Sequence, residues 1–409
     1  MMLRTLALIA AALAVAAAFA AGDPDEALQA INKLRTDTVA KARESGTAVN
    51  AVELNAKIKQ LAADAIKDVK PMDVEPTKAY SWAQLYNYAG EYEEIHMLCE
   101  MYQTTKPSPA LSFGAHYLCL QSFANLKTYS MGVETLKEMP LPTSMNAYSA
   151  AMMAANTFAP GIAREKGNKA AFDMLADVEA RLPYTDADPQ NQRYLDSARA
   201  AIATSNANLI KQESGTEAAL KYLDNKVKFA GTDTLKAAYT AGARGMKSEM
   251  TRTALIGTTA PMFPVERTIG TFTNFEALKG KVVIVDFFAH WCGPCIASFP
   301  DVRKMYDDLK GQGLEIIGAT TYYGYYKQER ELSKDAEFAK MSDFMADHKM
   351  NWPVVYSDRS LFEVYGVTGI PTTYLIGRDG TIHSFHVGYS AESFKKFRAE
   401  VEKLLNEKH

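Results

Sequence analysis

Apolar positions follow two different patterns along this chain. Before about residue 250 they recur at helical spacing, as in the series Leu85, Tyr88, Tyr92 and Ile95. Beyond about residue 265, short apolar runs such as VVIVDFF (282–288) alternate with helical stretches. The first pattern predicts an all-α region, and the second predicts an α/β region built around a sheet.

The helical region carries a weak internal repeat. Shifting the sequence by about 38 residues places Leu85 on Phe123, and such a period is typical of stacked helical hairpins. Prolines gather at breaks such as KPSP (106–109). We therefore predict a helical-hairpin domain over residues 21–250. Within it, WAQLYNYAGEYEEIHML (82–98) resembles a degenerate tetratricopeptide repeat.

The helical pattern stops in TRTALIGTTAPMFPV (251–265), which carries two prolines and no helical period. We place the domain boundary there and predict a second domain over residues 251–409. The sequence RDG (378–380) predicts a tight turn between its last two strands. The predicted strands are 282–288, 314–320, 353–357, 372–377 and 381–387, and the predicted helices are 295–310, 336–348 and 390–405.

The first residues have the form of a secretory signal. Arg4 supplies a positive start, Leu6 to Ala17 form an apolar stretch, and Ala18-Phe19-Ala20 is an A-x-A cleavage site. An uncleaved anchor is the alternative, but the whole apolar run, Leu6 to Ala21, has about 16 residues and is shorter than the roughly 20 that a membrane span needs. We therefore predict a signal peptide at 1–20, export to the periplasm or another extracytoplasmic compartment, and no stable membrane insertion.

Composition narrows the function further. The chain has 409 residues and a formal net charge of −3, with 47% apolar and 23% charged residues, which is ordinary for a globular protein of two domains. No basic run stands out, so nucleic acid is not an expected partner. Four cysteines are too few for a disulfide-dense scaffold, so the domains depend on apolar cores.

Two of the cysteines, Cys292 and Cys295, lie together in FAHWCGPC (288–295). A zinc site usually needs four ligands, whereas this pair stands alone. Ile296 follows the pair, so the C-x-x-C-H motif of haem attachment is absent. A purely structural disulfide would close a loop of four residues and would constrain the unfolded chain very little. These arguments favour a redox pair over a metal site or a clip.

The position of the pair supports that chemistry. A buried strand leads directly to Cys292, which we expect to be exposed, and a helix follows at once. Pro294 suits a first helical turn. Free amides and the helix dipole would stabilise a thiolate on Cys292 and lower its pKa. Cys295 lies one turn deeper, where it can resolve a mixed disulfide formed on Cys292.

The motif resembles the active site of thioredoxin. VVIVDFFAHWCGPC (282–295) is similar to its active-site strand and dithiol, and VYGVTGIPTTYLIGRDGTI (364–382) is similar to its cis-proline segment. LIGTTAPMF (255–263) and the long interval between Cys295 and Pro371 resemble the exported TlpA-like and ResA-like branch. The resemblance implies a thioredoxin fold for about 255–405, so the whole chain is expected to be α + α/β.

The resemblance also implies roles for individual residues. Cys292 and Cys295 would be the redox pair, and Pro371 would be a cis-proline that faces them. The backbone of Ile370 would then pair with an extended substrate segment. Asp286 matches the aspartate that accepts the proton of the buried thiol. The alternative for Asp286 is a carboxylate at a strand end that reaches water.

Three neighbouring features leave alternatives open. Trp291 is a candidate substrate-binding residue that would shield the cysteines, although packing in an aromatic core explains it equally well. His290 could tune the thiolate, but we favour a surface position. TTYYGYYKQEREL (320–332) is either a substrate-facing loop or, as we favour, an amphipathic edge packed on an inserted segment.

The other two cysteines are Cys99 and Cys119. If 91–104 and 109–126 form an antiparallel hairpin, Cys119 lies more than a helical turn from the position opposite Cys99. Bridging requires Cα atoms within about 7 Å. We therefore predict two buried free thiols.

The pattern as a whole predicts an exported thiol–disulfide oxidoreductase that acts as a protein disulfide reductase, with no dissociable cofactor and no metal. Its expected partners are protein disulfides or dithiols and a membrane-embedded thiol electron donor. A peroxidase site is disfavoured because Ala289, His290 and Trp291 do not supply the upstream proline and threonine of peroxiredoxins. The alternative function is a partner-binding helical scaffold with an accessory thioredoxin-fold module.

Overall fold

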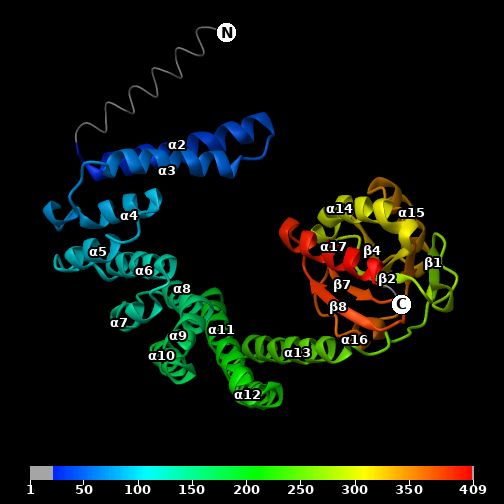
Figure 1. Cartoon of the computed structure of the whole chain (residues 1–409). Helices are drawn as coiled ribbons and strands as arrows, with labels where there is room; N and C mark the ends of the chain where they lie inside the picture. The colour runs from blue at the N-terminus through cyan, green and yellow to red at the C-terminus, as the bar shows by residue number, and fades with distance from the viewer. Residues whose placement is uncertain (1–21, 408–409) are drawn as a thin grey trace, which may run out of the picture. The chain divides into compact units, whose positions relative to one another are not determined.

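The structure is a computed structural model that describes residues 22–407, so the predicted signal peptide at 1–20 lies outside the described residues. The chain divides into two compact units, Met1–Thr240 and Ala241–His409 (Figure 1). No helix among the described residues has both the length and the apolar character needed to cross a bilayer. The two units are described separately below.

The first unit is helical throughout its described part, which confirms the all-α prediction. Its helices are α2 (Pro24–Ser45), α3 (Ala51–Ile66), η2 (Pro71–Asp73), α4 (Ala79–Ala89), α5 (Ile95–Gln103), α6 (Pro109–Leu126), η3 (Tyr129–Met131), α7 (Gly132–Glu138), α8 (Ser144–Met153), the π-helix η4 (Ala154–Phe158), α9 (Ala159–Lys166), α10 (Asn168–Ala180), α11 (Pro189–Ser214) and α12 (Thr216–Lys228).

Local sequence sets the ends of these helices. The Asp23 carboxylate accepts from the amide of Asp25 and caps α2, and Asp188 caps α11 in the same way. Gly90 ends α4 in the left-handed conformation, with φ +82°. Successive helices then pack on each other, α2 on α3, α3 on α4, α4 on α5 and α5 on α6. Helices α2 to α6 therefore pack against their neighbours in sequence, whereas α11 packs extensively on α8, which it does not directly follow.

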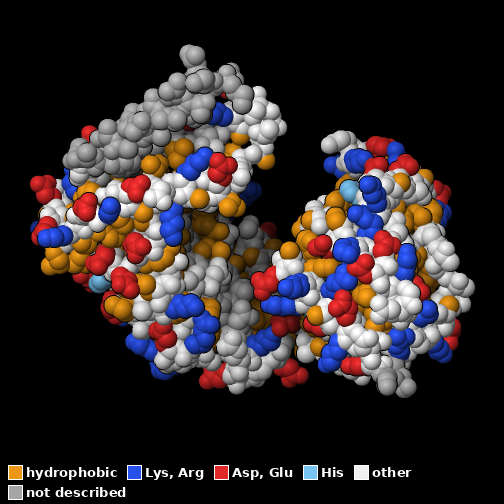
Figure 2. Space-filling model, turned by 45° about the horizontal axis from the view of Figure 1, so that its top comes forward, with side chains coloured by type: hydrophobic (Ala, Val, Ile, Leu, Met, Phe, Trp, Pro, Cys, Tyr) orange, Lys and Arg blue, Asp and Glu red, His pale blue; other side chains and the backbone are white. Residues whose placement is uncertain are grey.

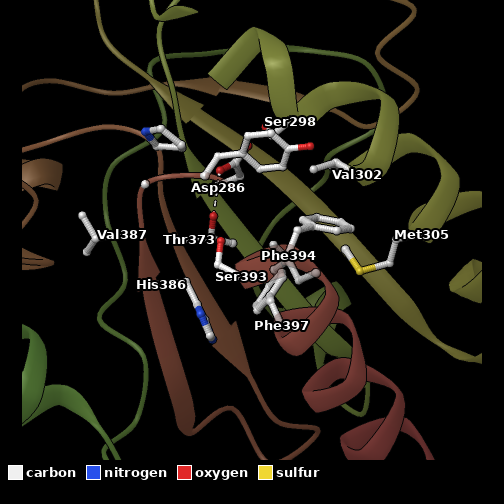
Figure 3. Close-up of a pocket in the computed structure, with 14 residues that line it drawn as sticks. Asp286, Ser298, Val302, Met305, Thr373, His386, Val387, Ser393, Phe394 and Phe397 are labelled. Carbon is white, nitrogen blue, oxygen red and sulfur yellow. Dashed lines mark hydrogen bonds between the residues drawn. The ribbon is translucent and has the colours of Figure 1, made fainter. Parts of the chain in front are cut away.

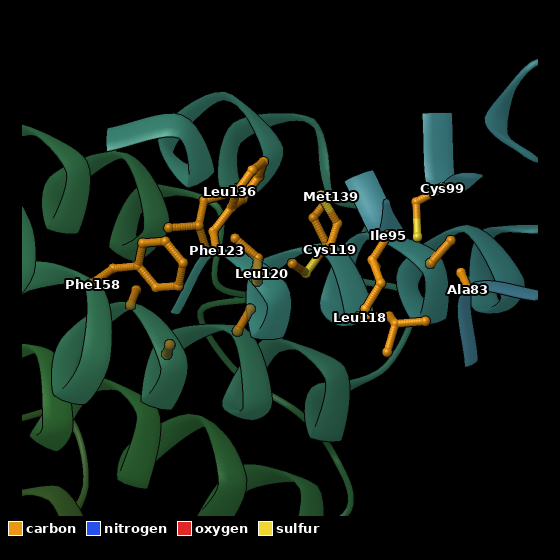
Figure 4. Packing of buried hydrophobic residues seen from close by; sticks show 14 of the residues in the cluster. Ala83, Ile95, Cys99, Leu118, Cys119, Leu120, Phe123, Leu136, Met139 and Phe158 are labelled. Atoms are coloured by element: carbon orange, nitrogen blue, oxygen red, sulfur yellow. The ribbon is translucent and has the colours of Figure 1, made fainter. Parts of the chain in front are cut away.

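The buried cluster of this unit contains both of its cysteines. Cys99 on α5 and Cys119 on α6 are buried and free, within the apolar cluster shown in Figure 4. Ile95, Leu98 and Leu120 are fully buried in the same cluster. Burial raises the pKa of the Cys119 thiol to about 12, so this thiol is inert near neutral pH. The prediction of two buried free thiols is confirmed.

Helix α13 (Asp233–Leu255) continues through the division between the units at residue 240. It ends at Leu255, within the segment 251–265 where the helical pattern of the sequence stops. The predicted boundary at residue 250 therefore falls inside this helix. The residues that follow include the short strand β1 (Arg267–Ile269), which the sequence pattern did not predict.

The second unit is a six-stranded mixed sheet with strand order β1-β6-β3-β2-β7-β8. Strands β2, β3 and β6 are parallel, whereas β1, β7 and β8 pair antiparallel. The other elements are β2 (Val282–Phe287), α14 (Gly293–Leu309), η6 (Lys310–Gln312), β3 (Leu314–Thr320), β4 (Tyr325–Tyr326), β5 (Glu329–Arg330), α15 (Lys334–Asp347), β6 (Val354–Tyr356), α16 (Ser360–Val364), β7 (Thr372–Ile376), β8 (Ile382–Val387), α17 (Ala391–Asn406) and η5 (Glu276–Leu278).

The central strand β2 is buried on both faces, which explains its unbroken apolar run. Its even-numbered residues, such as Ile284, pack with residues of α14, α15 and α17. Its odd-numbered residues, such as Val285, pack with Leu361 of α16 and with Tyr365. The five predicted strands and three predicted helices of this unit are confirmed, with ends that differ by at most two residues.

One irregularity lies in the pairing of β7 with β8. Leu375 pairs with Ser384, but the next residue, Ile376, pairs with Ile382. His383 is therefore an extra residue on β8, a β-bulge. The tight turn predicted at 378–380 follows, with Gly380 at φ +81°.

Candidate active site

The two cysteines of the second unit are joined in a disulfide at the start of α14. Strand β2 delivers the chain to this point, and Cys292 is the N-cap residue of the helix. Its sulfur accepts a hydrogen bond from the amide of Cys295 at 3.2 Å. Pro294 lies at the second helical position, as the sequence predicted. The sulfur that would carry negative charge therefore lies at a helix N-terminus, where the amide of Cys295 donates to it.

Cys292 is less accessible than the sequence predicted. Its exposed fraction is 3%, and Cys295 is fully buried, so the expectation of an exposed Cys292 is wrong for this oxidised form. The N-cap geometry turns the Cys292 sulfur toward the first turn of the helix, where it bonds to Cys295. The exposed residues at this point are Trp291, at 47%, with Gly293 and Pro294.

Trp291 is not part of a buried aromatic core, so core packing does not explain it. Its ring meets the ring of Tyr323 edge-on at 5.3 Å. An exposed aromatic ring next to the disulfide presents apolar surface to a partner molecule. Its predicted role in substrate binding remains a prediction.

The Ile370–Pro371 peptide bond is cis, as the resemblance to thioredoxin implied. Pro371 is buried, and its carbonyl accepts from the amide of Gly388 at 2.7 Å. The Ile370 side chain packs against the cluster that contains both Cys292 and Cys295. Within residues 22–407, the backbone N–H and C=O of Ile370 have no hydrogen-bond partner. A free backbone donor and acceptor beside a disulfide can pair with an extended polypeptide.

Asp286 is the fifth residue of β2 and is buried, with 3% exposure. It does not lie at a strand end that reaches water. Thr373 on β7 donates a hydrogen bond to Oδ1 at 3.0 Å, and Oδ2 has no hydrogen-bond partner among the described residues. Burial raises the pKa of Asp286 to about 6, although the bond from Thr373 opposes the shift.

Asp286 faces a small cavity of about 60 Å³ that Figure 3 shows from close by. Ser298 of α14 and Pro371 also line it. In the sheet, Asp286 lies opposite Thr373, and Thr373 lies opposite His386. The three side chains therefore form a row across the strands on one face. His386 Nε2 is 3.0 Å from a carboxylate oxygen of Glu400, which is partly exposed.

His290 is buried, with 7% exposure, so the favoured surface position is wrong. Its Nε2 lies 3.7 Å from Oε1 of Glu337, and burial lowers its pKa while Glu337 partly opposes this. The histidine ring contacts Tyr323, Tyr325 and Tyr326 with centroids between 5.3 and 5.7 Å apart. The residue before Trp291 is therefore held inside a shell of tyrosines.

The tyrosine-rich segment forms the β4–β5 hairpin and the loop that precedes it. The buried Glu337 of α15 accepts from the amides of Tyr323 and Gly324 at 2.8–3.0 Å and fixes the loop. The segment is packed on α15, as the favoured interpretation predicted, and the alternative of a substrate-facing loop stays a prediction. Sequence reasoning missed Glu337, because one acid among the charged residues of α15 gives no signal of its burial.

No group of three or more His, Cys, Asp or Glu side chains in residues 22–407 is placed to hold a metal ion. The chemical groups of the site are instead two sulfurs, a buried carboxyl group, an exposed tryptophan and an unpaired stretch of backbone. Together they suit exchange between a dithiol and a disulfide.

Comparisons with known proteins agree with this chemistry. Residues 256–385 match the AhpC/TSA family, so the match lies within the second unit and leaves the helical unit unassigned. The thiol-disulfide oxidoreductase ResA of Bacillus subtilis (strain 168) is 33% identical over 138 residues, which cover 34% of this chain and 70% of ResA. The thioredoxin-like protein YneN of the same organism is 26% identical over 132 residues, covering 32% and 71%.

Among solved structures, a thiol-disulfide isomerase from Corynebacterium glutamicum aligns with a TM-score of 0.32 at 19% identity, over 37% of this chain and 99% of that one.

Proposed function

The chain belongs, through its second unit, to the family of ResA-related thiol-disulfide oxidoreductases, and we propose that it reduces disulfide bonds in client proteins. The observation that carries the proposal is the position of the Cys292 sulfur. It caps α14 and accepts from the amide of Cys295, so the same amides would stabilise the thiolate of the reduced enzyme.

The reaction begins from the reduced dithiol. The Cys292 thiolate attacks one sulfur of the client disulfide, that S–S bond breaks, and the first client sulfur leaves as a thiolate. Cys295 then loses its proton and attacks the Cys292 sulfur of the mixed disulfide. The second client thiolate leaves, and the Cys292–Cys295 disulfide forms. Two electrons have passed from the enzyme to the client, and the described structure is the oxidised product.

Asp286 supplies the base for the second step. Its pKa of about 6 lies close to neutral pH, where a base both holds its ionised form and accepts a proton readily. The cavity that it shares with Ser298 and Pro371 has a volume of about 60 Å³, which is enough for a water molecule to carry the proton.

The client segment pairs with the free backbone of Ile370, and Trp291 covers the reacting sulfurs. Ile370 lies directly before the cis-proline Pro371, and its N–H and C=O are unpaired within the described residues. An extended client strand would then lie across the disulfide in the manner of a strand added to a sheet edge.

The direction of electron flow is proposed from the Cys-Gly-Pro-Cys sequence. Thioredoxin shares this sequence and is a reductant at about −270 mV, whereas the oxidant DsbA has a potential of about −120 mV. A reductase in an oxidising compartment needs an external electron source, so a membrane-embedded thiol donor is implied. Export itself rests on the signal-like sequence of residues 1–20, and fractionation of cells that express a tagged chain tests it.

The decisive experiment is dithiothreitol-dependent reduction of insulin, combined with the redox equilibrium against glutathione. We expect turnover and a potential closer to −270 than to −120 mV. A potential above about −150 mV would reassign the protein as an oxidant. No turnover with either insulin or peptide disulfides would refute the oxidoreductase function.

The second candidate function is a partner-binding scaffold formed by tetratricopeptide-like helical hairpins. The packing of successive helices in the first unit favours it, because such stacks present extended surfaces. Figure 2 shows hydrophobic side chains at the surface of this unit, and Val52 and Met72 are among the most exposed apolar residues. Rescue of a deletion phenotype by a chain that lacks both Cys292 and Cys295 would favour the scaffold.

A further inference from the structure

A polar groove lies beside the redox pair in the second unit. Its volume is about 720 Å³. One wall is the C-terminal half of α13, and the others are the loop after β3 and the segment that runs from α16 toward the cis-proline. None of the residues that form it belongs to the redox motif.

The α13 wall is fixed to the catalytic unit. Arg252 donates a hydrogen bond to the carbonyl of Gly366, and its guanidinium lies 5.4 Å from the centre of the Phe385 ring. Gly366 has φ +60°, and a Cβ atom there would meet the Ser248 carbonyl of α13 at 2.6 Å. Because only glycine fits this approach, the close packing of α13 on the segment after α16 depends on Gly366.

The groove is positively charged. Arg244 and Lys247 from α13 and Arg359 from the loop before α16 line it, and all three are exposed. Within residues 22–407, none of these three cations has an ion-pair partner. Among the described residues that line the groove, Glu363 is the one with a carboxylate. Many other surface lysines of this unit are paired, as Lys334 is with Glu266 at 2.7 Å.

The groove also leads to the site of reaction. Tyr323 lines it and contacts the ring of Trp291 at 5.3 Å. Thr368 lines it too, two residues before Ile370, whose backbone is free to pair with a client strand. An extended chain advances about 3.3 Å per residue. A client strand that is held at Ile370 and continues past Thr368 would therefore enter the groove that the cations line.

We propose that this groove binds an acidic, extended segment of the client polypeptide next to the disulfide to be reduced. The inference rests on the proposed reductase function and names the class of client. The cations are exposed, so each contributes modestly and the interaction weakens with salt. They increase the rate of encounter and the affinity for the client, and they leave the thiol chemistry unchanged.

The test compares matched peptides and matched variants of the full chain. Three peptides carry the same internal disulfide, flanked by Glu and Asp, by Gln and Asn, or by Lys and Arg. The double variant Arg244→Glu/Lys247→Glu reverses the charge at two positions of the groove. The double variant Arg244→Gln/Lys247→Gln removes the charge at the same two positions. The control is Lys395→Glu on α17, which removes an exposed lysine that has no ion pair among the described residues and does not line the groove.

For the acidic peptide we expect the double reversal to raise KM about fivefold to tenfold and to leave kcat unchanged. The neutral variant should give a smaller increase, the control should behave as the parent, and added salt should remove the difference. Equal KM values for the acidic and neutral peptides, or an equal effect of Lys395→Glu, would overturn the proposal.

A second measurement separates this inference from the reductase function. Peptides in which serine replaces both cysteines are titrated into the oxidised full chain, and binding is followed by fluorescence anisotropy. Charge-selective binding without disulfide reduction would support the groove and refute the reductase. Reduction without charge selectivity in either assay would support the reductase and refute the groove.

Discussion

The two units of this protein bury their apolar side chains in different ways. The helical unit packs helices that follow one another in sequence, such as α4, α5 and α6. The catalytic unit pairs strands that are far apart, as β2 does with β7. This pairing brings Asp286 of β2 and Pro371, which directly precedes β7, to the wall of one cavity. Packing between helices that are close in sequence gives the first unit an extended surface. Pairing between strands that are distant in sequence gives the second unit a site where polar groups meet.

The N-cap residues of two helices show the same contrast between the units. In the helical unit, the Asp188 carboxylate accepts from the amides of Gln190 and Asn191 and begins α11. In the catalytic unit, the Cys292 sulfur accepts from the amide of Cys295 and begins α14. The first cap is a stable anion that only holds the helix. In the proposed mechanism the second cap becomes an anion when it is reduced, and it is then the nucleophile.

The largest expected effect is the loss of this nucleophile. Cys292→Ser should lower insulin reduction by at least about 10³-fold, because a hydroxyl cannot form the mixed disulfide. Cys99→Ser is the matched control, since this buried thiol belongs to the helical unit, and its activity should equal that of the parent. Turnover that survives in Cys292→Ser would show that the comparison between the two caps is mistaken.

Truncation of one buried side chain in the helical unit should show whether the two units unfold independently. Leu85 is fully buried in the helical unit, and Leu85→Ala should destabilise that unit by about 2–5 kcal/mol. Hydrogen exchange, followed segment by segment, should show faster exchange in α4 and α5 and unchanged protection of β2. The rate of reduction of a small peptide disulfide should not change. Equal loss of protection in β2 would mean that the two units unfold together.

Asp286→Asn should lower activity and raise stability at once. Loss of the base should slow the resolving step about 10²-fold at neutral pH. Burial raises the pKa of Asp286 to about 6, so the folded chain binds the proton more tightly than the unfolded chain. The stability of the parent therefore falls as the pH rises from about 4 to 6, by about 3 kcal/mol in total.

In Asp286→Asn the free energy of unfolding should not fall as the pH rises from about 4 to 6. Urea denaturation between pH 4 and 8 measures this difference. The two proteins should have similar stability at pH 4, and the variant should be the more stable at pH 7. Parallel curves across this range would contradict a raised pKa. A normal rate of resolution in the variant would remove Asp286 from the mechanism.

The smallest expected effect concerns the other cap. Asp188→Ala should destabilise the helical unit by about 1 kcal/mol, because two amides of α11 lose their acceptor. Asp173→Ala removes an exposed pair with Lys169 and should cost no more than about 0.5 kcal/mol. Thermal unfolding of the two variants tests the difference. Neither change should affect disulfide reduction, and an effect of Asp188→Ala on turnover would show that the helical unit takes part in the chemistry.

Much of the catalytic unit was predictable because its signals are local. The run VVIVDFF predicted β2, and two cysteines followed by a helix predicted the redox pair. The cis bond before Pro371 came only from the resemblance to thioredoxin. Strand β1 was not predicted, because its three partly buried residues at a sheet edge carry no apolar pattern.

The two errors concerned burial. The sequence favours a surface position for His290, but Tyr325, Tyr326 and Glu337 cover it from segments that follow β3. The place of Cys292 after a strand predicts an exposed sulfur, but this sulfur turns into the helix and bonds to Cys295, three residues further on. The first burial depends on segments that are distant in sequence, and the second depends on the local geometry of a helix N-terminus.

The extra residue His383 on β8 acts as a spacer between two demands on the same hairpin. At one end, the turn at 378–380 fixes how many residues connect the strands. At the other, His386 must stay level with Thr373, because a shift by one position would carry its ring to the opposite side of the sheet. The bulge absorbs the mismatch, so the loop can change in length or composition during evolution while His386 keeps its place beside Thr373.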